Sequence, residues 1–171
     1  MSTDRGSWLA RIDRPDRDEL LALVGFVVLV NLVGGAAAVI GGPGSDWFAS
    51  LEKPWFYPPS WLFGVVWTLL FTLMGIALYR VWRVGWSDRA VRVAVALFVA
   101  QMAVNVAWTP AFFGLQNPGL ALVVILVLGP LVAATIWAFD RVDRTAAALL
   151  VPYLLWVSFA TVLNAAIWLA N

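Results

Sequence analysis

The residues in this chain that could do chemistry are amides and aromatic rings lying within long apolar segments. One set recurs at spacings of four, three and four residues, which places its members on one face of a helix. The set consists of Gln101, Asn105, Trp108 and Phe112. A polar side chain in a lipid-embedded helix turns toward the bundle interior, because hydrocarbon leaves its hydrogen bonds unmade. This face is therefore predicted to point inward.

Three other apolar segments carry comparable stripes. The last segment presents aromatic and amide residues at three- and four-residue steps, the second presents large apolar residues, and the first holds an asparagine near two glycines. The residues are Tyr153, Trp156, Ala160, Asn164 and Ile167 in the last segment, Phe63, Trp67, Leu70 and Met74 in the second, and Asn31, Gly34 and Gly35 in the first. Inward amides either hold helices together or contact a ligand, and their spacing leaves both roles open.

The sequence gives no support for acid–base, nucleophilic or metal chemistry. The chain has no histidine and no cysteine, and every charged residue lies outside the long apolar segments. No buried carboxylate pair, histidine-activated nucleophile, usual zinc ligand set or usual haem ligand is therefore expected. We predict no metal site, no required cofactor and no nucleic-acid partner, with any ligand held by stacking, shape and hydrogen bonds.

Five apolar segments must position these residues. Hydrophobic residues make up 63% of the 171 residues, charged residues make up 12%, and the mean hydropathy is +0.87, values typical of an integral membrane protein. The segments cover about residues 20–40, 61–79, 93–113, 119–139 and 145–169, which are lengths suited to crossing a bilayer. We predict an all-α membrane protein, with a five-transmembrane-helix bundle in residues 20–171 and a solvated N-terminal tail in residues 1–19.

The first loop is rich in aromatic residues and prolines. Residues 54–59 read PWFYPP, and each proline restricts its own backbone and that of the residue before it. The loop is therefore stiff, and the second helix can begin only after Pro59. A stiff aromatic loop at the end of a hydrophobic bundle predicts a lid over an apolar ligand.

Eleven tryptophans are more than the anchoring of five helices requires. Six lie near predicted segment ends, where tryptophan commonly anchors a helix at the membrane interface. These six are Trp8, Trp47, Trp82, Trp86, Trp137 and Trp168. Trp67, Trp108 and Trp156 lie inside segments and are better candidates for a binding site. Broad flat rings favour a broad flat apolar ligand.

A stripe of small residues follows the third segment. Ala96, Ala100, Ala103 and Ala107 have the spacing that allows two helices to approach closely. We expect this contact most simply within the bundle, and a homodimer contact is the alternative.

The basic residues are distributed unevenly between the two sides of the predicted bundle. Every Lys and Arg except Lys53 falls in the N-terminal tail, the second loop or the fourth loop. The positive-inside rule therefore predicts a cytoplasmic N-terminus, with the first loop and the C-terminus on the opposite side.

Several ordered motifs resemble the TspO/MBR family of tryptophan-rich sensory proteins and translocator proteins. They are Trp47 followed by LEKP at 51–54, PPSWLFGVVWT at 58–68, NVAWTPAFF at 105–113 and PYLLWVSFATVLN at 152–164. The resemblance covers about residues 20–171. It implies a five-helix bundle, commonly a homodimer in the membrane lipid, with a cavity under the first loop that binds porphyrins such as protoporphyrin IX.

The resemblance also implies which residues line that cavity. They are Trp47, Phe48, Leu51, Trp67, Asn105, Trp108, Trp156, Phe159, Ala160 and Leu163. The family's usual tryptophan two residues before the proline pair is missing, so Phe56 or Tyr57 must serve in the lid. The last segment lacks the Tyr followed by Lys or Arg that the sterol-recognition pattern needs, and sterol transport is not expected.

The function predicted on these grounds is tetrapyrrole binding for transport, scavenging or sensing. One alternative is a light-dependent porphyrin-degrading enzyme that uses Trp67 and Trp156, which match family positions implicated in porphyrin handling. Another is a regulatory partner protein switched by its ligand. In that case residues 1–19 would be needed for the cellular effect but not for ligand binding.

Overall fold

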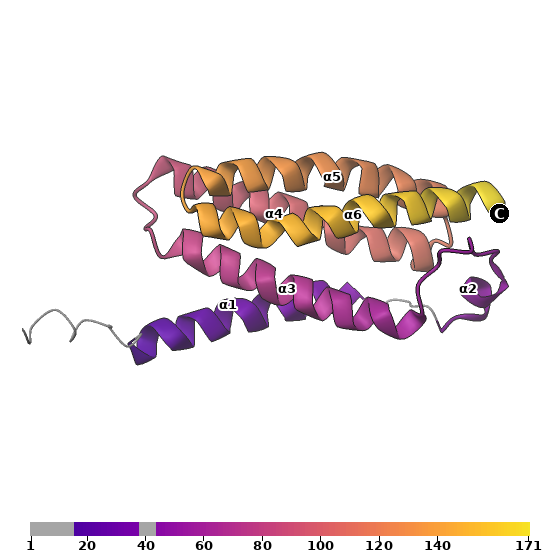
Figure 1. Cartoon of the computed structure of the whole chain (residues 1–171), viewed down its shortest axis with the longest axis horizontal. Coiled ribbons are helices and arrows are strands. Elements are labelled where there is room, and N and C mark those ends of the chain that lie inside the picture. Colours follow the sequence, from indigo (N-terminus) through magenta and orange to yellow (C-terminus); the bar gives the residue numbers. More distant parts are fainter. Residues whose placement is uncertain (1–15, 38–43) are drawn as a thin grey trace, which may run out of the picture.

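The computed structural model describes residues 16–37 and 44–171, and its long elements there are five helices. They are α1 (Arg17–Ala36), α3 (Ser60–Trp82), α4 (Arg89–Thr109), α5 (Pro118–Asp140) and α6 (Arg144–Ala170) (Figure 1). Each is long and apolar enough to cross a membrane, which confirms the predicted all-α five-helix bundle. The predicted tail up to residue 15 and the predicted end of the first segment, residues 38–40, lie outside the described residues.

Two groups of helices make up the bundle. Helix α1 packs mainly on α3, whereas α4 and α6 both pack on α5, and α3 joins the groups through α6 (Figure 1). Two glycines allow α1 to lie close to α3. A Cβ atom on Gly75 would lie 2.6 Å from the Cα atom of Val27, and one on Gly34 would overlap the ring of Phe71.

The helix boundaries follow from local chemistry. Helix α3 begins at Ser60, directly after Pro59, as the sequence predicts. Asp88, Asn117 and Asp143 precede α4, α5 and α6, and each side chain accepts a hydrogen bond from a backbone N–H in the first turn. These bonds are 2.8 to 2.9 Å long. The turn between α4 and α5 closes at Gln116, whose φ of 52° lies in the left-handed region.

The end of the bundle that holds the start of α1 and the loops after α3 and α5 is the charged end; the opposite end, with the first loop, is the loop end (Figure 1). At the charged end the helices are packed closely. The fully enclosed side chains there include Ala77, Val81, Val91, Ala94, Phe139 and Ala146. Small side chains let the helix axes approach, and the close packing fixes their relative positions.

An ion pair joins the C-terminal end of α3, next to the second loop, to the start of α6. Arg80 lies 2.8 Å from the Asp143 carboxylate, and a second nitrogen donates to its other oxygen at 3.3 Å. Desolvation by itself raises the pKa of Asp143, but the Ala146 N–H and the Arg80 guanidinium together outweigh it. The pKa of Asp143 therefore lies below its ordinary value.

The structure corrects the prediction for the alanine stripe of α4. Ala96, Ala100, Ala103 and Ala107 are all exposed on the outside of the described bundle, so the expected contact within the bundle is wrong. The buried face of α4 carries Ala94, Phe98, Gln101, Met102 and Asn105 instead. The inward orientation predicted for Gln101 and Asn105 is thus confirmed.

Two short elements were not predicted. Helix α2 (Asp46–Ser50) lies in the first loop, and a π-helical turn (Pro110–Gly114) extends α4. Four tryptophans predicted as interfacial anchors, Trp82, Trp86, Trp137 and Trp168, are exposed near helix ends. Trp47 instead packs into the bundle at the loop end, and Trp8 lies outside the described residues.

Candidate ligand cavity

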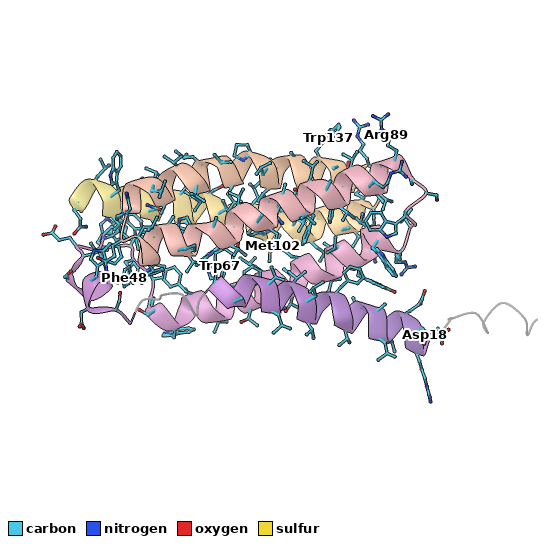
Figure 2. All side chains as sticks on the ribbon, turned by 180° about the vertical axis from the view of Figure 1, so that it is seen from behind. Asp18, Phe48, Trp67, Arg89, Met102 and Trp137 are labelled. Carbon is cyan, nitrogen blue, oxygen red and sulfur yellow. The ribbon has the colours of Figure 1, made fainter. Side chains whose placement is uncertain are left out.

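A cavity of about 530 Å³ lies between the helices toward the loop end. This volume falls in the range of about 300 to 1,000 Å³ that is usual for small-molecule sites. All five long helices, α2, the first loop and the π-helical turn contribute to its wall, and no lining residue among those described carries a charge. Figure 2 shows Trp67 within the bundle, with Phe48 at the loop end.

Aromatic rings form much of the wall. Trp67 stacks on Phe71 with ring centroids 5.2 Å apart, and Trp108 stacks on Phe112 at 5.0 Å. The Trp156 ring meets Phe63 edge to face at 5.8 Å. Trp156 lines the cavity, and its indole N–H is enclosed without an acceptor among the described residues. Ring faces held by other rings make a rigid apolar surface.

One asparagine at the cavity holds three helices together. The Trp108 indole N–H donates to Asn164 Oδ1 at 3.0 Å, and Asn164 Nδ2 donates to the carbonyl of Pro118 at 2.8 Å. Both polar groups of Asn164 are therefore engaged, and they connect α4, α5 and α6. This arrangement gives Asn164 the helix-joining role that its spacing left open.

A second network is buried between α4 and α6. Asn105 Nδ2 donates to the Tyr153 hydroxyl at 2.9 Å, and that hydroxyl donates to Gln101 Oε1 at 2.9 Å. Gln101 and Tyr153 are each about 1% exposed. Asn105 lines the cavity, so this chain of hydrogen bonds fixes a cavity side chain from behind.

The first loop closes on the cavity through Phe48. Its side chain is 5% exposed and packs against Phe112 and Phe113 with centroids 6.0 and 5.3 Å away. Lys53 holds α2 in place, because its ammonium donates to the carbonyls of Phe48 at 2.7 Å and Leu51 at 3.1 Å. The same ammonium lies 4.6 Å from the Phe48 ring centroid.

The first loop is also joined to the last residue of the chain. The Glu52 N–H donates to Asn171 Oδ1 at 3.0 Å, and Asn171 Nδ2 donates back to the Glu52 carbonyl at 3.1 Å. Sequence reasoning missed both Lys53 and Asn171. Their roles depend on backbone carbonyls brought near by the fold, and no local pattern signals them.

The two loop rings proposed to replace the missing tryptophan have different positions. Phe56 packs edge to face on Phe159 at 6.4 Å, whereas Tyr57 lines the cavity and lies 5.6 Å from Phe63. Trp55 is 95% exposed and does not line the cavity.

Most residues predicted for the site line the cavity. Those that do are Phe48, Trp67, Asn105, Trp108, Trp156, Ala160 and Leu163. The other three, Trp47, Leu51 and Phe159, pack in the cluster around Phe48 and Phe112 behind the wall. Contact between any of the ten and a ligand stays a prediction. Phe71 and Phe113 also line the cavity and were not predicted for it, whereas Tyr57, which lines it too, is one of the two rings expected to serve in the lid.

Comparisons with known proteins agree with this architecture. The family model described as TspO/MBR family matches residues 23–169. The chain is 43% identical to the tryptophan-rich protein TspO of Chlorobaculum tepidum over 85% of this chain and 93% of that one. It is 42% identical to the translocator protein of Bos taurus, over 86% and 89% of the two chains. It is 43% identical to the tryptophan-rich sensory protein of Cereibacter sphaeroides, over 76% and 81%.

Proposed function

Because this integral membrane protein belongs to the TspO/MBR family, we propose that it binds a tetrapyrrole such as protoporphyrin IX in the bundle cavity. The bound ligand would serve transport, scavenging or sensing. The observation that carries the proposal is the uncharged, ring-lined cavity, in which Trp67, Trp108 and Trp156 come from three different helices.

Stacking can supply useful affinity here without a metal–ligand bond. A micromolar dissociation constant corresponds to about −8.2 kcal/mol. Each aromatic pair adds about 0.5 to 1.5 kcal/mol beyond the area that it buries. Several ring contacts together with burial of a flat macrocycle therefore account for binding of that order, after the costs of association.

A dark titration with protoporphyrin IX tests the proposal. We expect saturable, micromolar quenching of tryptophan fluorescence and a change in porphyrin absorbance. Trp67→Phe and Trp156→Phe should each weaken binding about two- to tenfold, the loss of roughly one aromatic pair. Trp137→Phe is the matched control, because Trp137 is 59% exposed and stacks under Arg141 outside the cavity. Equal binding in all three variants would exclude the cavity as the site.

The enzymatic alternative predicts a further result with the same variants. Porphyrin absorbance would be lost under light with turnover, and replacement of Trp67 or Trp156 by Phe would abolish that loss while sparing binding in the dark. Photobleaching that proceeds equally in the wild type and both variants would exclude a role for these two rings in such chemistry.

We also propose the topology in the membrane. Among the described basic residues, only Lys53 lies at the loop end, which supports a cytoplasmic N-terminus with the first loop and C-terminus on the other side. The chain has no cysteine, so Ser50→Cys and Ser87→Cys give single labelling sites at opposite ends. An impermeant thiol reagent added outside intact cells should label the first and not the second; the reverse would overturn this topology.

A homodimer is proposed as the working assembly. Its support is the exposed alanine stripe of α4, where two helices could approach closely in lipid. Ala100→Leu, at the centre of the stripe, should shift the purified protein toward a monomer in light scattering. A dimer that persists unchanged would place the interface elsewhere.

A further inference from the structure

A second hollow, separate from the ligand cavity, lies between α1 and α3 at the charged end. Its volume is about 200 Å³. Leu20, Leu23 and Ile76 make its apolar wall, whereas Glu19 and Arg83 bring charged groups to it. A groove that joins apolar and charged surfaces on a transmembrane bundle is suited to an amphiphile.

The charges of this groove are arranged in an unusual way. Arg80 also lines it, but the ion pair with Asp143 neutralises that guanidinium. Within residues 16–37 and 44–171, neither Glu19 nor Arg83 has an oppositely charged group within 4.0 Å. The two line one groove from different helices without pairing with each other, leaving one negative and one positive site.

The groove lies at the level where lipid head groups are expected. Trp82 is 36% exposed and packs on Phe26 with ring centroids 5.2 Å apart, as an interfacial aromatic side chain would. The apolar residues of α1 beside the groove are exposed outward, including Leu20 at 45% and Leu21 at 70%. An acyl chain could therefore continue from the groove along α1.

We propose that this groove binds a phospholipid whose head group carries a primary ammonium, of the phosphatidylethanolamine class. Its phosphate would lie at the Arg83 guanidinium, its ammonium at the Glu19 carboxylate, and one acyl chain along Leu20, Leu23 and Ile76. A purely anionic lipid can pair its phosphate with the Arg83 guanidinium, but its negative charge then lies near the Glu19 carboxylate, which repels it. A choline lipid carries the positive charge but has no N–H group to donate to the carboxylate.

The test is a competition among lipids with identical acyl chains. The full chain in detergent is given an equimolar mixture of phosphatidylethanolamine, phosphatidylglycerol and phosphatidylcholine, and the retained lipid is measured by native mass spectrometry. The wild type should retain phosphatidylethanolamine in excess of both others. Hydrogen bonds to charged groups contribute about 1.5 to 3 kcal/mol, so Arg83→Gln should lower that retention by about tenfold or more.

Glu19→Gln gives the discriminating result. It should lower retention of phosphatidylethanolamine and raise that of phosphatidylglycerol, because the repulsion of an anionic head group is removed. Arg141→Gln and Glu52→Gln are the matched controls, since both residues lie outside the groove, and they should leave the preferences unchanged. Arg83→Lys keeps the charge and should give an intermediate retention, and the thermal midpoint of each variant checks its folding.

Two outcomes would overturn the proposal. A wild type that retains phosphatidylglycerol as well as or better than phosphatidylethanolamine would indicate a general basic surface. Ratios that are the same in Glu19→Gln, Arg83→Gln and the controls would show that lipid is held elsewhere. Porphyrin binding plays no part in this measurement, so its result is independent of the function proposed for the cavity.

Discussion

At the charged end of the bundle the long helices meet through enclosed side chains, whereas at the loop end they surround a cavity of about 530 Å³. The first arrangement uses small residues such as Ala77, Ala94 and Ala146 to bring helices together. The second uses rings such as Trp67 and Trp108, each of which stacks on a ring four residues further along the chain and lines the open space. The closely packed charged end is therefore the rigid frame within which the loop end can keep an open space.

Truncating one ring at each end should give the largest difference in unfolding free energy between the two ends. Phe139 is 0% exposed and stacks on Phe98 at 6.0 Å, so Phe139→Ala should cost about 3 to 5 kcal/mol of unfolding free energy. Phe63→Ala removes a ring that already borders open space, and roughly half that cost or less is expected. Denaturant unfolding in detergent measures both. Equal costs would mean that the cavity wall is packed as tightly as the closed end.

Removing the amide that joins three helices should have a smaller effect. Asn164→Ala leaves the Trp108 indole N–H and the Pro118 carbonyl without their partners, at a cost of about 1 to 3 kcal/mol. Thr161→Ala is the control, because the Thr161 hydroxyl donates only to the Val157 carbonyl of its own helix. Near-equal midpoints for the two variants would argue against a joining role for Asn164.

The smallest effect concerns acid pH and the charged end. The folded-state pKa of Asp143 lies below its ordinary value of 3.8, so its contribution is present above that pH and is lost as pH falls through the lowered pKa. The pair with Arg80 is partly exposed, and about 1 kcal/mol or less is expected. Asp143→Asn keeps a good helix cap but removes the charge. The thermal midpoint of that variant should therefore change less than that of the wild type on acidification below about pH 4.

Much of the helical frame was predictable from the sequence. The length of each apolar segment predicts a membrane-spanning helix, and the spacing of the amide residues predicts which face of a helix points inward. The inward positions of Gln101, Asn105 and Asn164 follow from the cost of exposing an amide to hydrocarbon. The alanine stripe of α4 was misread, since small residues suit any close contact and spacing does not identify the neighbour. The partners of Lys53 and Asn171 are backbone carbonyls that only the folded chain brings near.

Asn31, Gly34 and Gly35 of α1 form part of the cavity wall, yet α1 is fastened to the bundle chiefly through α3. Its opposite face, with Leu29 and Leu32 more than half exposed, is left to the bilayer. Lateral pressure from the surrounding lipid therefore bears on one side of the cavity through a single helix. The thickness and stiffness of the membrane therefore act on the shape of the cavity, and its walls bear a different load in a thin fluid bilayer than in a thick rigid one.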